Sequence, residues 1–153
     1  MATRCNICVR LRREDIGKSL RIDLEKIESN SGAVNSYFNE VTLDGEYIEI
    51  YVHWDGYPTG VGKELVSNYN TYEKALNLTL GGDCSSVYSE WIPYVINNQD
   101  WDQNKPRILS ELPDAENDYL YVFDLDCWWV KSWSGLEFIN LREYLNSLNM
   151  NEQ

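Results

Sequence analysis

The stretch YIEIYVHWDGYPTGVGKELVSNYN, residues 47–70, carries the strongest secondary-structure signals in this chain. Its first eight residues alternate, with Ile48, Ile50, Val52 and Trp54 on one side and Tyr47, Glu49, Tyr51 and His53 on the other. This alternation predicts a strand that buries its apolar side, Trp54 included, in the core. The Gly- and Pro-containing segment 55–60 ends the strand, and the apolar spacing in 61–70 predicts a helix after it.

Four segments elsewhere predict further strands and turns. CNICVRLR (5–12) alternates clearly, and SLRIDLEKI (19–27) favours a second strand over a helix. ESNSGAVNS (28–36) has the composition of a loop, and LDGEY (43–47) contains an Asp-Gly turn signal. DYLYVFDLDCWWVKSW (118–133) predicts a hairpin that turns near Asp124–Asp126 and places Trp128 and Trp129 on opposite sides of its second strand.

Two segments, 71–80 and 140–150, predict helices. Each begins with a pair of residues at capping-box spacing, which are Asn70 with Glu73 and Asn140 with Glu143. The Gly81-Gly82 pair ends the first of these helices.

The order of these elements predicts the fold class. Strands and helices do not alternate regularly, which favours an α+β fold with a mostly antiparallel sheet and helices packed on it. A chain of 153 residues fits a single domain, here 1–150. Residues 12–46 and 91–118 are expected to form insertions or long loops.

The charge of the chain limits its partners. The formal net charge is −12, and residues 1–30 hold seven basic and five acidic groups, so the excess of acid lies in the rest. An acidic body repels phosphate backbones, so direct nucleic-acid binding is not expected. It attracts a basic partner, and an acidic mimic of nucleic acid remains an alternative. The six Trp and eleven Tyr suit a binding surface.

The termini and cysteines predict the compartment. The first residues lack a long apolar segment, and no stretch approaches the length of a membrane span, so we expect a cytoplasmic protein without membrane contact. The four cysteines are then reduced thiols. Cys5 and Cys8 have C-x-x-C spacing but point to opposite sides of a strand, so we expect no metal site and no cofactor.

The candidate binding site is the loop within residues 51–65. A P-loop is excluded, because Gly56 and Gly62 are one residue too far apart and Glu64 replaces the hydroxyl that holds Mg²⁺. Free N–H groups around residues 60–63 and the Lys63 charge still suit an anion, whereas the alternative is a turn that only the fold needs. The candidate ligand-binding residues are Tyr51, His53, Asp55, Tyr57, Gly60 and Lys63.

His53 is the single histidine of the chain, so any imidazole chemistry must use it. It is expected to form a structural hydrogen bond or to contact a ligand, and no residue is assigned as catalytic. An enzyme alternative is a metal-assisted hydrolase or nuclease that uses His53 with Asp55. A nucleophile at Cys84, Ser85 or Ser86 is formally available, although no motif spacing ties these residues to His53.

Three segments of the chain resemble a known family. They are Thr3-Arg4 before the first strand, YVHWDGYPTGVGKELVSNYNTYEKALNLTLGGDCSS (51–86) and YLYVFDLDCWWVK (119–131). Together they are similar to an uncharacterised family of small proteins from phages, prophages and gut bacteria, which begin with an STR-like strand and carry an HWDGYP motif. The likeness spans about two thirds of the chain and departs over 12–46 and 91–118.

The resemblance implies a mobile genetic element as context. By analogy, the expected function is that of a small accessory binding protein, located in the host cytoplasm, which acts against host defence. It would bind a host defence protein or sequester a small nucleotide-like ligand at the HWDGYP loop, as a monomer or a homodimer. The metal-assisted enzyme and the acidic mimic are the two alternatives.

Overall fold

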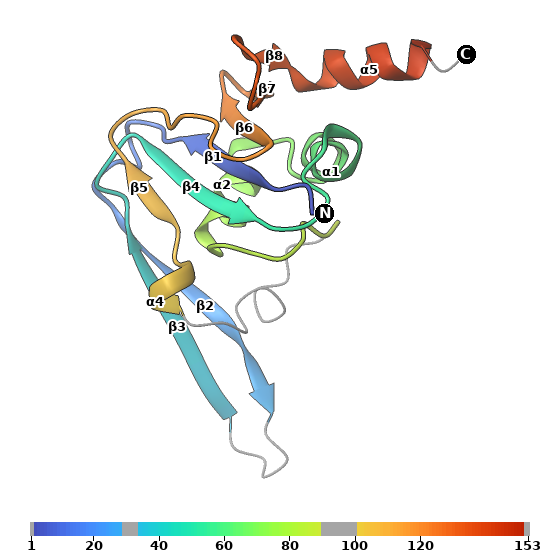
Figure 1. Ribbon diagram of the computed structural model, residues 1–153. Coiled ribbons are helices and arrows are strands. Elements are labelled where there is room, and N and C mark those ends of the chain that lie inside the picture. Colours follow the sequence, from blue (N-terminus) through green and yellow to red (C-terminus); the bar gives the residue numbers. More distant parts are fainter. Residues whose placement is uncertain (1, 29–33, 90–100, 152–153) are drawn as a thin grey trace.

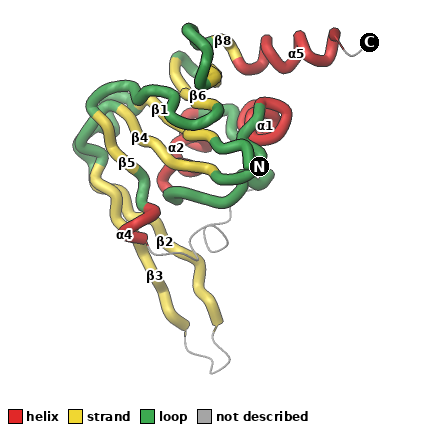
Figure 2. Tube along the Cα trace, in the orientation of Figure 1, coloured by secondary structure: helices red, strands yellow, loops and turns green. Residues whose placement is uncertain are grey.

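Six strands build the central sheet of the computed structural model, which describes residues 2–28, 34–89 and 101–151 (Figures 1 and 2). The elements are β1 (Cys5–Arg10), β2 (Ser19–Glu28), β3 (Val34–Thr42), β4 (Tyr47–Val52), η1 (Pro58–Gly62), α1 (Lys63–Asn68), α2 (Tyr72–Leu80), α4 (Trp101–Asn104), β5 (Arg107–Leu109), β6 (Tyr119–Asp124), β7 (Cys127–Ser132), β8 (Ile139–Asn140) and α5 (Leu141–Asn151).

The central sheet has the strand order β5-β4-β1-β6-β7-β8. Only the pair β1 and β6 is parallel, and the other neighbours run antiparallel. Parallel pairing needs a long crossover, and the chain between β1 and β6 supplies it with β2–β5 and the helices α1, α2 and α4. The predicted α+β class and the mostly antiparallel sheet are therefore confirmed.

Strands β2 and β3 form a separate two-stranded ribbon that extends away from the central sheet (Figure 1). The predicted strand over 19–27 is confirmed. The loop predicted over 28–36 is wrong at its end, because β3 begins at Val34. Val41 at the base of the ribbon is buried in the main core, which anchors the ribbon to the body.

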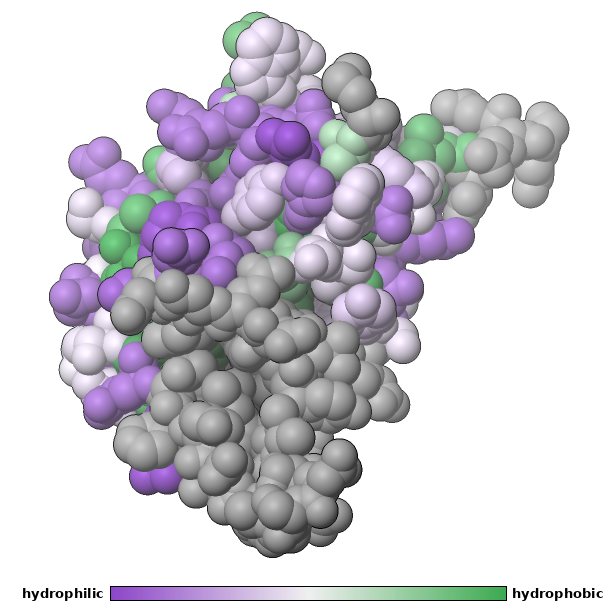
Figure 3. Space-filling view, turned by 60° about the horizontal axis from the view of Figure 1, so that its bottom comes forward, coloured by the Kyte–Doolittle hydropathy of each residue, from purple (hydrophilic) through white to green (hydrophobic). Residues whose placement is uncertain are grey.

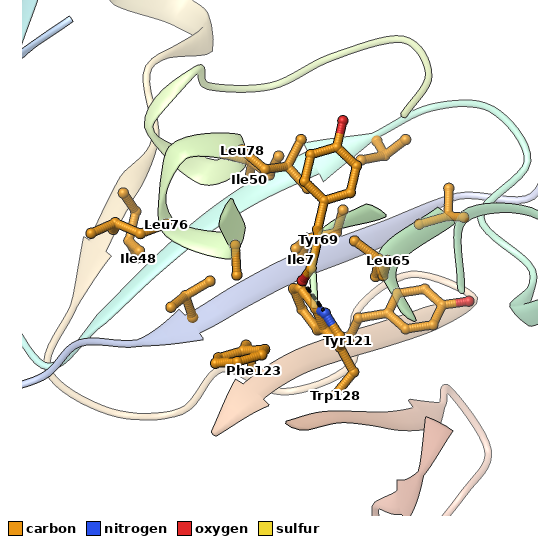
Figure 4. Packing of buried hydrophobic residues seen from close by; sticks show 14 of the residues in the cluster. Ile7, Ile48, Ile50, Leu65, Tyr69, Leu76, Leu78, Tyr121, Phe123 and Trp128 are labelled. Atoms are coloured by element: carbon orange, nitrogen blue, oxygen red, sulfur yellow. Dashed lines mark hydrogen bonds between the residues drawn. The ribbon is translucent and has the colours of Figure 1, made fainter. Parts of the chain in front are cut away.

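Helices α1 and α2 cover one face of the sheet, and the main core lies between these helices and the sheet (Figure 4). The predicted alternation buries Ile7, Ile48 and Ile50 completely on that face. Burying a side chain of this size contributes about 1.5–3 kcal/mol. The buried Trp128 indole is satisfied because its Nε1 donates to the Tyr69 carbonyl at 2.8 Å.

A second, smaller cluster occupies the opposite face of the sheet. Cys8, Leu120 and Val122 are buried there, with Ala115 and Phe138 packed against them. Cys5 belongs to the main core, so the prediction that the two thiols of the C-x-x-C pair face opposite sides is confirmed.

The helix and hairpin ends follow local side-chain chemistry. The α2 cap is Thr71, whose Oγ1 accepts from the Lys74 amide at 3.2 Å, so the prediction of an Asn70 cap is wrong. The predicted α5 cap is confirmed, since Asn140 Oδ1 accepts from the Glu143 amide at 3.0 Å. The β6–β7 turn lies where predicted, with positive φ at Leu125 and Asp126.

The segment predicted as a long loop over 91–118 is not all loop. Residues 91–100 lie outside the described residues, and after the short helix α4 the strand β5 pairs with β4 at the sheet edge. The sequence did not predict β5, because a strand of three residues is too short to show the period-two alternation of a strand. Among the described residues, no helix has the length and apolar character needed to cross a membrane.

Candidate functional site

The HWDGYP loop continues the line of β4 after that strand ends at Val52. The amides of His53 and Trp54 donate to the carbonyls of Cys84 and Ser85 at 3.3 and 2.8 Å. The 84–85 segment, which follows α2, therefore runs beside the loop and holds its first two residues in place.

Two further bonds clamp the middle of the loop. The Gly56 amide donates to the Thr3 carbonyl at 2.9 Å, and the buried Tyr121 hydroxyl donates to the Gly56 carbonyl at 2.6 Å. A Cβ at position 56 would lie 2.9 Å from the Thr3 carbonyl oxygen and from Arg4 C, so only glycine fits without a shift. Asp55, just before it, adopts the left-handed region with φ of 58°.

The amides that the sequence predicts as an anion cradle already have partners. The Gly60 amide donates to the Tyr57 carbonyl at 2.9 Å, and the Val61 amide donates to the Asp55 carbonyl at 2.8 Å. The Lys63 amide donates to the Gly60 carbonyl. The prediction of free N–H groups is therefore wrong for Gly60, Val61 and Lys63, whose amides bond to carbonyls of the loop and of the wide turn η1.

Four of the six candidate residues line a small hollow of about 200 Å³ beside this turn. They are Asp55, Tyr57, Gly60 and Lys63. The Tyr57 hydroxyl donates to Asp55 Oδ1 at 3.3 Å. Glu64 also lines the hollow, so Lys63 shares it with two carboxylates.

His53 lies in a different and larger groove of about 600 Å³. Its lining residues come from the N-terminal segment, the HWDGYP loop and the ends of the β5–β6 connection and β7: Ala2, Arg4, His53, Trp54, Glu116, Asn117, Asp118 and Trp133. The prediction that Trp54 is a core residue is wrong, since 49% of it is exposed. Trp133 is 71% exposed, so two accessible indoles line one groove.

Tyr51 and His53 contact each other rather than the hollow. The Tyr51 hydroxyl and His53 Nδ1 are 2.9 Å apart, and the Trp54 and His53 rings form a T-shaped pair with their centroids 4.6 Å apart. The structure therefore divides the six candidates into a Tyr51–His53 pair at the groove and four residues at the hollow.

The cysteine closest in the chain to this loop is poorly suited to nucleophilic chemistry. Burial, and then the charge of Asp83, raise the pKa of Cys84 to about 12, so its thiolate is disfavoured at neutral pH. Among the described residues, no group of three or more His, Cys, Asp or Glu side chains has the arrangement of a metal site.

A network that the sequence did not reveal joins β4, β5 and the turn after α2. Arg107 Nε lies 3.0 Å from Glu49 Oε1, and Arg107 Nη1 lies 3.2 Å from Asp83 Oδ1. Asp83 Oδ1 also accepts from the Tyr51 amide at 2.8 Å. Desolvation by burial raises the pKa of Glu49, although the bond from Arg107 opposes this. The network fixes Tyr51, and through it the position of His53.

Apart from His53, the residues that line the groove were outside the predicted site, Trp133 and Asp118 among them. Asp118 Oδ2 accepts from the Arg4 amide at 2.9 Å, which joins the N-terminal segment to the start of β6. The signal for Trp133 was present, because alternation along 127–133 puts it on the same side as the charged Lys131 and opposite the buried Trp128. Comparisons with protein-family models, curated proteins and solved structures gave no match.

Proposed function

We propose that this chain is a small accessory binding protein of a phage or mobile element, and that it acts against host defence by binding a host protein at the HWDGYP face. The observation that carries the binding function is the groove in which the half-exposed Trp54, the exposed Trp133 and His53 converge. The mobile-element context comes from the resemblance of the HWDGYP segments alone.

Exposed indoles at one place favour a partner surface over a merely structural loop. Burying apolar surface stabilises a protein or a complex by about 25 cal/mol per Å², and a Trp side chain can bury about 150–250 Å². An indole that stays exposed does not gain this stabilisation until a partner covers it. Trp is also enriched among the residues that dominate protein–protein binding energies. In the view of Figure 3 the described surface is mainly hydrophilic or neutral, with small hydrophobic areas.

Charge favours a protein over the alternative nucleotide-like ligand. The groove holds Glu116 and Asp118 against Arg4, and the hollow holds Asp55 and Glu64 against Lys63. The whole chain carries a formal charge of −12. A phosphate-bearing ligand would be repelled by this field, and the amides predicted to hold its phosphate are bonded within the loop.

The enzyme alternative has less support from the geometry. His53 Nδ1 bonds to the Tyr51 hydroxyl, and Asp55 bonds to Tyr57, so the two side chains are engaged with different partners and do not act as one His–Asp pair. His53 lines the groove, whereas Asp55 lines the hollow.

The test is a plaque assay in host strains that each carry one defence system, with and without this protein. We expect the wild type to restore plaques against at least one system, and Trp54→Ala/Trp133→Ala to lose roughly tenfold or more of that effect. Leu136→Ala is the matched control, because Leu136 is 95% exposed and lies outside the groove lining.

Two results would contradict the proposal. If the folded double Trp variant protects as well as the wild type, the groove is not the binding surface. If His53→Asn alone abolishes protection while the Trp variant keeps it, the enzyme alternative replaces the binding function.

A further inference from the structure

We infer that the groove receives a cationic side chain, Lys or Arg, from the partner protein. This inference rests on the proposed function and specifies the chemistry of the contact. Its basis is that two accessible indoles and two carboxylates line the same groove.

The carboxylates of the groove are available to a cation. Glu116 is exposed and belongs to none of the ion pairs formed among the described residues. Asp118 uses Oδ2 to accept from the Arg4 amide, a bond that leaves its negative charge uncompensated by a side-chain cation. An ammonium or guanidinium group entering between them would gain charge-assisted hydrogen bonds.

The two indoles also attract a cation, in addition to the carboxylates. The faces of Trp rings carry negative potential and attract cations more strongly than Tyr or Phe rings do. The Trp54 and His53 rings are nearly perpendicular, with an interplanar angle of 85°, so the two rings are not stacked face to face. Arg is the better occupant of the two, because its planar guanidinium can stack on an indole while it bonds a carboxylate.

Arg4 makes the sign of the ligand testable. It lines the same groove and is exposed, and its guanidinium takes part in none of the ion pairs among the described residues. An anionic ligand would use Arg4, whereas a cationic ligand would be repelled by it. Removing this charge therefore changes the affinity in opposite directions for the two ligand classes.

The experiment is an NMR titration of the indole ¹H–¹⁵N signals of Trp54 and Trp133 at low salt. The probe is a capped Gly-Arg-Gly-Arg-Gly peptide, and the matched probe has citrulline in place of Arg, which keeps the shape and removes the charge. We expect the Arg peptide to shift both signals and the citrulline peptide to shift neither.

Three single-charge variants make the result specific. Glu116→Gln is expected to weaken binding of the Arg peptide about two- to fivefold, the range of an exposed ion pair. Glu111→Gln changes the net charge equally, but Glu111 is outside the groove lining, so its effect is expected to be smaller. Arg4→Gln is expected to strengthen binding.

The inference is overturned if the citrulline peptide binds as well as the Arg peptide, if the two Glu variants behave alike, or if Arg4→Gln weakens binding. Its failure is separable from that of the proposed function. If the double Trp variant loses its effect in the plaque assay but the Arg peptide does not bind, the groove is still the partner surface. Only the inference of a cationic partner side chain is then rejected.

Discussion

Single residues hold the HWDGYP loop in its conformation, and Gly56 is one that the surrounding backbone constrains closely. Its amide and carbonyl bond to Thr3 and Tyr121, which belong to segments far apart in the sequence. The sequence predicted a turn at this position from the Gly-Tyr-Pro residues. It did not predict the cause, because the close approach of the N-terminal segment is a tertiary contact that no local pattern records.

We expect Gly56→Ala to destabilise the protein by about 1–3 kcal/mol, the usual range for overpacking a close contact. The new Cβ would meet Thr3 O and Arg4 C at 2.9 Å, and both are backbone atoms that cannot rotate away. Urea unfolding at neutral pH measures the change. Thr59→Ala, at an exposed position in the same loop, is the control, and equal effects of the two substitutions would contradict the clamp.

A second residue-scale contact predicts a pH effect. The Tyr72 hydroxyl donates to Asp15 Oδ2 at 2.7 Å and accepts from the Arg12 amide at 3.0 Å. The hydrogen bond from Tyr72 lowers the pKa of Asp15. A lowered carboxyl pKa stabilises the fold above the ordinary pKa of Asp, and this contribution is lost as the pH falls through the folded-state pKa.

Tyr72→Phe is therefore expected to cost about 1 kcal/mol at neutral pH and to have a smaller effect at pH values below the folded-state pKa of Asp15. Unfolding curves measured from neutral to strongly acidic pH test this. Tyr144→Phe is the control, because the Tyr144 hydroxyl takes part in none of the hydrogen bonds among the described residues. A Tyr72→Phe deficit that stays constant with pH would refute the coupling to Asp15.

At the scale of elements, the structure shows which sequence patterns were sufficient. The period-two pattern of residues 47–52 and the acidic turn at 124–126 predicted β4 and the β6–β7 hairpin correctly. The pattern failed for Trp54, which it placed in the core, because the strand ends before it and the loop pairs with 84–85 instead. It also missed β5, which is defined by pairing with β4 rather than by its own composition.

The Glu49–Arg107–Asp83 network joins β5 to β4 and to the turn after α2, so we expect it to stabilise β5 at the sheet edge. Arg107→Met leaves the buried Glu49 without its cation, so we expect a loss of about 1–3 kcal/mol, below the value for a fully buried pair because the Arg107 side chain is 40% exposed. Burial already raises the pKa of Glu49. A raised carboxyl pKa stabilises the fold at low pH, and that contribution is lost as the pH rises through the folded-state pKa.

The Arg107→Met deficit is therefore expected to grow as the pH rises from acid to neutral, because the Glu49 charge then forms without a partner. Thermal unfolding across that pH range measures it. Adding Glu49→Gln removes the unpaired charge, so the double variant is expected to be more stable at neutral pH than Arg107→Met alone. A double variant that is no more stable would contradict a role for the Glu49 charge.

At the scale of the whole molecule, the fold brings distant segments to one end of the sheet. The N-terminal segment, the HWDGYP loop, the start of β6 and the end of β7 all contribute to the groove. The sequence predicted the loop as the site, but it could not group its residues. Alternation correctly placed Tyr51 and His53 on one side of the strand. Only the tertiary structure shows that this pair lies away from the hollow, and that Trp133 lines the groove beside His53.

Site-specific photo-crosslinking in host cells shows whether a host protein binds at this groove. A p-benzoyl-phenylalanine side chain would replace Trp133 or Ala2 in the groove lining, and Leu136 outside it as the control. We expect one discrete protein adduct from positions 133 and 2 and none from position 136. Equal adducts from all three positions would contradict binding at the groove. So would the absence of any adduct from positions 133 and 2 in cells in which the protein overcomes host defence.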